Sequence, residues 1–179
     1  DKFLNPVLNA RVLLNRFCTA LAKNDYTYRR PNRRIEEEYL PSLEGDNGLE
    51  HLIYYIDVSG SITKEMILRF HSEVYHIKKA FNPEKITIVS FDTKIQDMWE
   101  FSKDENYRSL EIKSGGGTAL GPVYKHIRKN KPTAALIFTD LHVQMMPNPR
   151  IPVIWVVDGS LKAPFGKTVN LPKEAKVKR

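Results

Sequence analysis

Three runs of apolar residues most constrain how this chain can fold. They span Leu52 to Val58, Ala134 to Asp140 and Ile151 to Asp158, and none shows a regular alternation of apolar and polar residues. A strand with one face in water alternates in this way, whereas a strand covered on both faces is apolar almost throughout. We therefore expect these runs to be central strands of a parallel sheet.

Segments with helical periodicity separate the strands along the chain. Apolar residues recur at spacings of three and four from Met66 to Phe81, and a second helix is expected from Ala119 to Arg128. A further strand is expected from Ile86 to Phe91, followed after a turn by an antiparallel edge strand from Ile95 to Phe101. This alternation predicts a three-layer α/β fold with helices on both faces of a Rossmann-like, mostly parallel sheet that has one antiparallel edge strand.

The residues outside this pattern divide the chain into three parts. Residues 1–48 comprise a helix, expected between Asn5 and Asn24, and a connector. Residues 49–160 form the α/β domain. Residues 161–179 form a basic C-terminal extension, in which six Lys or Arg accompany one Glu. Because most of the net charge of +7 lies in this extension, the rest of the chain is only mildly basic.

The composition limits the cellular setting. Cys18 is the only cysteine, which excludes an internal disulfide and a cysteine-ligated zinc site and fits a reducing compartment. No apolar run reaches the roughly 18 residues that span a bilayer, and the start of the sequence has no signal-peptide pattern. We therefore expect a cytoplasmic protein without a membrane partner. Because the sequence begins with Asp rather than Met, we also expect it to be a piece of a longer protein.

Oxygen-bearing side chains follow the strands at one edge of the predicted sheet. Asp57, Ser59 and Ser61 occupy alternate positions at the end of the first strand, and Asp140 ends a later one. Thr118 follows a glycine-rich loop that leads into a helix. In a sheet of this kind, ligands bind beyond the carboxyl ends of the strands, where the strand order switches. We therefore expect these five side chains to converge.

The chemistry of this set points to a metal ion. All five side chains are hard oxygen donors, and the set contains no His or Cys. Such a set suits Mg²⁺ or Mn²⁺, which favour about six oxygen ligands and retain some waters. Gly60 and the three glycines before Thr118 let the backbone turn and come close. The sequence therefore predicts a magnesium or manganese site formed by Asp57, Ser59, Ser61, Thr118 and Asp140.

The same residues carry a resemblance to a known family. The segment DVSGS, residues 57–61, resembles the Asp-x-Ser-x-Ser signature of von Willebrand factor A domains. Thr118 after GGG resembles the second motif of that family, and FTD, residues 138–140, resembles the third. Three motifs in the right order make the resemblance specific, and it covers about residues 49–158.

This resemblance implies a metal-ion-dependent adhesion site. It implies that Ser59, Ser61 and Thr118 contact the metal directly, and that Asp57 and Asp140 act mostly through water. The remaining coordination position would take an Asp or Glu carboxylate of a partner protein. One departure concerns the third motif, because many relatives carry Gly after its Asp, whereas this chain has Leu141-His142.

A narrower resemblance extends to the flanks. The segments YTYRRPNRR, YLPSL and PFGKTVNLP are similar to those that flank a bacterial and phage von Willebrand-like domain located after a metallopeptidase-like domain. The resemblance implies a MoxR-type AAA+ ATPase, or the protein's own upstream domain, as the partner. Because no His-Glu-x-x-His motif occurs in this chain, any peptidase activity is expected upstream, and the chain itself is not expected to be an enzyme.

Two other functions stay open. The first is a metal-dependent hydrolase such as a phosphatase, with Ser59 as the nucleophile, although the sequence offers no obvious base for it. The second is nucleic-acid binding, which would use the tail lysines together with Arg29, Arg30, Arg33 and Arg34 and would weaken steeply with salt. A phosphate-binding loop at GGGT is disfavoured, because the Lys-Ser/Thr pair of such loops is missing.

Overall fold

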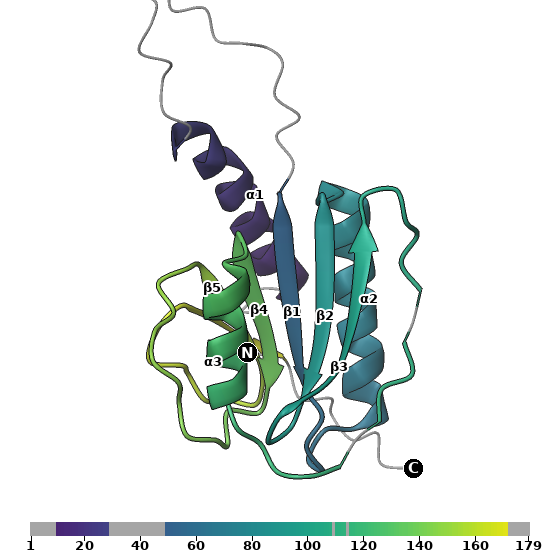
Figure 1. The fold of residues 1–179 in the computed structure, drawn as a ribbon, viewed down its shortest axis with the longest axis vertical. Coiled ribbons are helices and arrows are strands. Elements are labelled where there is room, and N and C mark those ends of the chain that lie inside the picture. The colour runs from purple at the N-terminus through teal and green to yellow at the C-terminus, as the bar shows by residue number, and fades with distance from the viewer. Residues whose placement is uncertain (1–9, 29–48, 109, 114, 172–179) are drawn as a thin grey trace, which may run out of the picture.

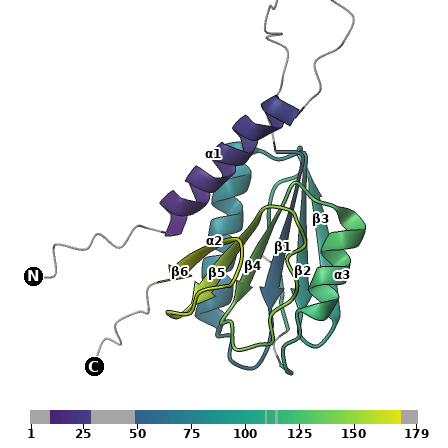
Figure 2. The ribbon, with the colours of Figure 1, turned by 90° about the vertical axis from the view of Figure 1, so that its left-hand side faces the viewer.

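The strands in the described part of the chain form one six-stranded sheet in the order β3-β2-β1-β4-β5-β6. Figure 1 shows β3, β2, β1 and β4 side by side, and Figure 2 shows β5 and β6 beyond β4. The computed structural model describes residues 10–28, 49–108, 110–113 and 115–171. Its elements are α1 (Ala10–Tyr28), β1 (His51–Asp57), α2 (Lys64–Phe81), β2 (Lys85–Phe91), β3 (Ile95–Ser102), α3 (Gly121–Asn130), β4 (Ala134–Thr139), β5 (Val153–Asp158) and β6 (Lys167–Leu171).

The central strand β1 runs parallel to both of its neighbours. Leu52 of β1 pairs with Ile86 of β2 on one side and with Ala134 of β4 on the other. At the edge, β3 pairs antiparallel with β2, and a register shift occurs between Ser90 and Phe91. The predicted fold class, a mostly parallel sheet with one antiparallel edge strand, is therefore confirmed.

Helices cover both faces of this sheet, as Figure 2 shows: α1 and α2 lie on one face and α3 on the other. Successive side chains of β1 point to opposite faces of the sheet and pack in two separate hydrophobic cores. Leu52, Tyr54 and Ile56 pack in the cluster that includes residues of α1 and α2. Ile53 and Tyr55 pack in the cluster that includes residues of α3. None of the helices in the described part of the chain is long and apolar enough to cross a membrane.

The first helix belongs to the core of the first face. Leu14, Cys18 and Leu21 are buried there, at spacings of four and three residues that place them on one face of the helix, and Phe17 packs against the same core while partly buried. The helix is described from Ala10 to Tyr28, so its predicted start at Asn5 lies outside the described residues and its end lies beyond the predicted Asn24. Burial raises the pKa of the Cys18 thiol to about 12, which identifies it as an unreactive, packed side chain.

The sheet extends past residue 160, where a basic extension was predicted to begin. Lys167–Leu171 forms β6 and pairs parallel with β5, and Val169 is buried under α1 and α2 with the rest of that core. This strand gives no strong periodic signal in the sequence, because it is only five residues long and contains Lys and Asn. Residues 172–179, the rest of the predicted extension, lie outside the described residues.

Candidate metal centre

The predicted site residues lie where the order of the strands switches. After β1 the chain first adds β2 and β3 on one side of β1, and then β4, β5 and β6 on the other. The switch therefore falls between β1 and β4, whose carboxyl ends carry the first and third segments of the site. The loop before α3 brings the second segment to the same edge, which is the place where such sheets bind ligands.

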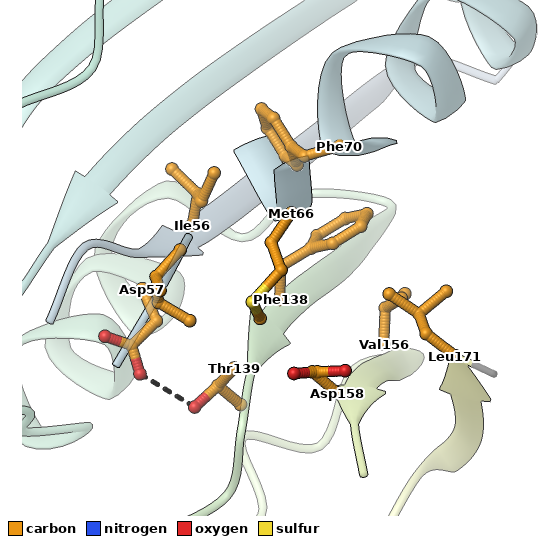
Figure 3. Close-up of a pocket in the computed structure, with 10 residues that line it drawn as sticks. Ile56, Asp57, Met66, Phe70, Phe138, Thr139, Val156, Asp158 and Leu171 are labelled. Atoms are coloured by element: carbon orange, nitrogen blue, oxygen red, sulfur yellow. Dashed lines mark hydrogen bonds between the residues drawn. The ribbon is translucent and has the colours of Figure 1, made fainter. Parts of the chain in front are cut away.

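Asp57 organises the buried end of the site. Its side chain is fully buried, and its Oδ1 accepts hydrogen bonds from the backbone N–H of Ser59 at 3.0 Å and from Thr118 Oγ1 at 3.4 Å. Its Oδ2 accepts a hydrogen bond from Thr139 Oγ1 at 2.8 Å, the bond drawn in Figure 3. A buried carboxylate requires donors of this kind. Asp57 therefore fixes Ser59 and Thr118 relative to the end of β4.

Ser61 and Asp140 form the exposed end of the site. Ser61 Oγ donates to Asp140 Oδ2 at 2.7 Å and lies 3.1 Å from Ser59 Oγ. The other carboxylate oxygen of Asp140 accepts the backbone N–H of His142 at 3.0 Å. Together with the bonds to Asp57, these contacts join all five predicted residues in one hydrogen-bonded network.

The direction of the bonds in this network follows from the number of hydrogens. A hydroxyl group has one hydrogen and two lone pairs, and an ionised carboxylate only accepts. The hydrogen of Ser61 goes to Asp140, so Ser59 must donate its own hydrogen to Ser61. Thr118 donates to Asp57. All three hydroxyl hydrogens are used inside the network, and oxygen lone pairs stay available for a cation.

Backbone contacts hold the glycine-rich loop against the first segment. Gly115 N–H donates to the carbonyl of Val58 at 2.8 Å, and Gly60 N–H donates to the carbonyl of Gly116 at 3.3 Å. Gly116 has a φ of 110°, and a Cβ placed there would lie 3.0 Å from Asp92 Oδ2. Gly116 is thus required both by its backbone conformation and by the close approach of Asp92.

Asp92, which the sequence did not single out, supports the same loop from the end of β2. Its backbone carbonyl accepts the N–H of Ala119 at 2.8 Å, next to Thr118. Its carboxylate accepts the backbone N–H of Lys94 at 2.9 Å and the side-chain amide of Gln96 at 2.5 Å. The bond from Lys94 is the main reason why the pKa of Asp92 lies below its usual value.

The departure in the third motif has a structural explanation. Leu141 adopts a φ of 62°, the left-handed region that glycine favours, and its side chain is buried in the α3-face core. Its N–H donates to Thr139 Oγ1 at 3.3 Å. Burial of the leucine side chain offsets the cost of the left-handed backbone, so the chain turns here without glycine.

A small pocket lies behind the network, on the α2 face of the sheet (Figure 3). Asp57 and Thr139 form its polar end, and Asp158 reaches it from the end of β5. The other lining side chains are apolar: Ile56, Ile62, Met66, Phe70, Phe138, Val156 and Leu171. An apolar wall of this kind excludes water and strengthens the hydrogen bonds made to Asp57.

The donor set fits a hard divalent cation. It offers two carboxylates and three hydroxyl groups, the ligands that Mg²⁺ and Mn²⁺ prefer. Within the described ranges, no group of three or more His, Cys, Asp or Glu side chains is placed to hold a metal. The residues whose oxygen atoms could hold such an ion are Asp57, Ser59, Ser61, Thr118 and Asp140.

A doubly wound sheet with an Asp-x-Ser-x-Ser loop at its switch point, completed by a Thr and an Asp from two further loops, defines a von Willebrand factor A-like domain. The chain belongs to the family of VWA-like domains designated DUF2201, whose model matches residues 52–172. A search of curated proteins found no match.

Two solved structures resemble this chain at low sequence identity. The ArnB paralog VWA2 from Sulfolobus acidocaldarius is 18% identical with a TM-score of 0.48, and the match covers 62% of this chain and 35% of that one. The conserved hypothetical protein BatB from Bacteroides thetaiotaomicron is 13% identical with a TM-score of 0.40, over 60% of this chain and 66% of that one. The match thus spans about a third of the length of the first protein and about two thirds of the length of the second.

Thr139 belongs to the site, although the motif pattern predicted no role for it. It follows Phe138, which pairs with Ile56, so the sheet register brings Thr139 beside Asp57. The available signal was a polar residue at the end of an otherwise apolar run, directly before Asp140. The hydroxyl is buried and turns inward to the carboxylate, which a strand pattern alone does not specify.

Proposed function

We propose that this chain is a metal-dependent protein-interaction module. It holds Mg²⁺ or Mn²⁺ at Asp57, Ser59, Ser61, Thr118 and Asp140 and binds an Asp or Glu carboxylate of a partner protein. One observation carries the proposal: the three hydroxyl groups give their hydrogens to one another and to the two carboxylates. The arrangement leaves oxygen lone pairs for a cation without breaking the network.

The five residues have different roles in this proposal. Ser59, Ser61 and Thr118 supply neutral oxygen ligands, and Asp140 supplies negative charge at the exposed end. Asp57, which is fully buried and accepts three hydrogen bonds, mainly positions the hydroxyl groups. A bound divalent cation supplies a positive charge for the incoming carboxylate, so a single acidic side chain of the partner is the main recognition element.

Binding is favoured over catalysis by the surroundings of Ser59, the candidate nucleophile. Its hydroxyl is paired with Ser61 Oγ at 3.1 Å, and its side chain is 5% exposed. A nucleophilic serine is normally activated by an adjacent base and open to its substrate. We therefore propose that the chain itself performs no hydrolysis. On the resemblance of its flanking segments alone, we propose a MoxR-type AAA+ ATPase or an upstream domain of the same protein as the partner.

The proposal is tested by metal titration of a matched pair of threonine variants. Thr118→Ala removes a proposed ligand, whereas Thr93→Ala removes a hydroxyl from the neighbouring turn that bonds only within that turn, to Asp92 at 3.3 Å. The wild type and Thr93→Ala are expected to melt at higher temperature in MgCl₂ or MnCl₂. A ligand present at 100 times its Kd adds about 2.7 kcal/mol. Equal metal-dependent shifts in Thr118→Ala and the wild type would contradict the proposal.

A further inference from the structure

An open groove begins at the candidate metal centre and leads away from it. One wall consists of residues 118–121, where the glycine-rich loop enters α3, and the other consists of residues 142–147 of the β4–β5 loop. The groove contains about 880 Å³ of empty space, its open side included. Nothing in the motif pattern predicted it, because its walls come from two loops that are distant in the sequence.

Both walls start at residues of the network. Thr118 belongs to the network and also lines the groove. On the other wall, the backbone N–H of His142 donates to Asp140 Oδ1 at 3.0 Å, and the same residue lines the groove. A partner segment whose carboxylate reaches the candidate metal centre can therefore place the next part of its chain in the groove.

The chemistry of the lining selects what can enter. The ten lining residues are Thr118, Ala119, Leu120, Gly121, His142, Val143, Gln144, Met145, Met146 and Pro147. Seven of them are apolar residues or glycine, the polar ones are Thr118, His142 and Gln144, and none is an Asp, Glu, Lys or Arg. A charged side chain placed there would lose part of its hydration without meeting a carboxylate, ammonium or guanidinium group, whereas an apolar side chain would contact the seven apolar or glycine residues. Val143 and Met145 are partly exposed, and methionine side chains adapt to the shape of what they contact.

We propose that this groove is the specificity pocket of the module, and that it accepts an uncharged, apolar side chain next to the partner's metal-bound Asp or Glu. The occupant is a protein segment in which an acidic residue is flanked on one side by a residue such as Leu, Met or Phe. The inference rests on the proposed function, because it uses the metal centre to hold the acidic residue. The metal site supplies the ionic contact, and the groove discriminates among acidic segments.

Gly121 allows the groove to be blocked with little disturbance of the fold. A Cβ at this position would meet no atom within 4 Å, and the residue does not adopt a positive φ. Gly121→Trp is therefore expected to fold and to place its indole ring at the groove. Lys129→Trp is the matched control, since it lies on the same helix about 12 Å further along the axis and outside the groove lining.

A substitution at Met145 should change which flanking residue of the partner the groove prefers, without abolishing binding. Its side chain is half-buried in the wall formed by the β4–β5 loop. Met145→Lys places a positive charge in the groove and is expected to convert the preferred flanking residue from apolar to acidic. A change of preference is a result that simple unfolding cannot produce.

The experiment is an array of synthetic nine-residue peptides with Asp at the centre and all residue types scanned at each flank. A second array carries Asn at the centre, and both are probed with the purified protein in MgCl₂ and in EDTA. We expect magnesium-dependent binding to Asp-centred peptides with an apolar residue at one flank. Gly121→Trp should weaken this binding at least tenfold, with the Mg²⁺ affinity and the Lys129→Trp control unchanged.

The outcomes separate the groove from the metal centre. The groove proposal is overturned if magnesium-dependent binding shows no flank preference, or if Gly121→Trp binds with the same affinity as the wild type. Either result leaves the proposed function of the metal centre standing. No magnesium-dependent binding to any Asp-centred peptide, together with no Mg²⁺ binding by the protein, overturns both. A magnesium-dependent dimer that Gly121→Trp dissociates, measured by light scattering, would instead assign the groove to a second copy of the chain.

Discussion

The side chains of Ser61 and Asp140 are joined by a hydrogen bond of 2.7 Å, although 79 positions separate them in the sequence. This bond links the loop after β1 to the loop after β4 at the exposed end of the site. It also orients the hydroxyl of Ser61, because the carboxylate can only accept. Substitutions at the site can therefore distinguish residues that bind the cation from residues that hold the two loops together.

Ser61→Ala is expected to reduce Mg²⁺ affinity by about tenfold or more. Loss of a residue that orients a metal ligand typically weakens metal binding by about 10- to 100-fold, and loss of a ligand itself should weaken it at least as much. Ser61 is exposed, so the substitution should change the free energy of unfolding by about 0.5 kcal/mol or less. Titration calorimetry and urea unfolding measure the two quantities. Ser72→Ala, at an exposed position of α2, is the control and should change neither; a parallel loss of stability and affinity in Ser61→Ala would contradict a ligand role.

Asp57→Ala is expected to destabilise the protein even without metal. The substitution leaves the donors of Ser59, Thr118 and Thr139 without their acceptor at a buried position. Each stranded donor costs about 1–3 kcal/mol. Thermal unfolding in EDTA measures this effect, and in MgCl₂ the variant should show no further stabilisation. Asp158→Ala serves as the comparison, since Asp158 lines the pocket of Figure 3 outside the network; equal losses in both variants would argue against a special role for Asp57.

Thr139→Val and Thr139→Ser form a pair that isolates one hydroxyl group. Valine keeps the shape but removes the donor to Asp57 Oδ2 and the acceptor for Leu141 N–H. We expect Thr139→Val to lower the free energy of unfolding by about 1–3 kcal/mol and to weaken Mg²⁺ binding. Thr139→Ser should recover most of the Mg²⁺ affinity. If valine and serine bind the ion equally well, the hydroxyl does not position Asp57.

Gly116→Ala and Gly121→Ala test the backbone of the second segment. At Gly116 the φ of 110° and the Cβ contact of 3.0 Å with Asp92 Oδ2 both oppose a side chain, so a loss of more than about 1 kcal/mol is expected. Gly121 begins α3 in open space, and alanine there is expected to be neutral or to stabilise by up to about 1 kcal/mol. Chemical unfolding curves of the two variants provide the comparison, and similar effects at both positions would contradict the described loop.

The pH dependence of stability is expected to involve His71. The side chain is buried, its Nδ1 is bonded to the hydroxyl of Tyr107, and its Nε2 lies 3.2 Å from the carbonyl of Leu110. Burial lowers the pKa of His71 below the ordinary histidine value of about 6.5. The unfolded chain therefore takes up a proton at a higher pH than the folded chain, and stability falls as the pH drops below about 6.5.

His71→Gln removes this proton linkage and keeps a polar side chain. The free energy of unfolding, measured by urea titration from neutral to mildly acidic pH, should fall less steeply in the variant than in the wild type. His51 and His126 also have pKa values that burial lowers, so the variant should retain part of the dependence. An identical slope in the variant and the wild type would exclude a contribution of His71.

Most of the fold could be predicted because buried parallel strands leave a strong signal. The runs at Leu52 and Ala134 were apolar on both faces, and both became central strands. The strand Lys167–Leu171 was missed because it is short and mixed in polarity, and its position depends on pairing with β5. Strand pairing of this kind is a tertiary property that local periodicity does not contain.

The site was predictable to a similar degree. The motif spacing identified five residues that the structure brings into one network, and their binding of a metal stays a prediction. Asp92 and Thr139 were missed because each acts through a contact that depends on the register of neighbouring strands and loops. The turn at Leu141 could not be foreseen either, since its left-handed backbone is offset by burial of its side chain in a core built from distant residues.

The pairing of β1 with β4 has a consequence for the order in which the molecule assembles. Leu52 lies beside Ala134 in the sheet, so this contact closes a loop that contains α2, β2, β3 and α3. Parallel pairings across such long loops are slow to form, because chain entropy is lost before the contacts are gained. The hydrogen bonds from Thr139 to Asp57 and from Ser61 to Asp140 lie at the end of the same pairing. They are expected to form late in folding, and weakening them should speed unfolding more than it slows folding.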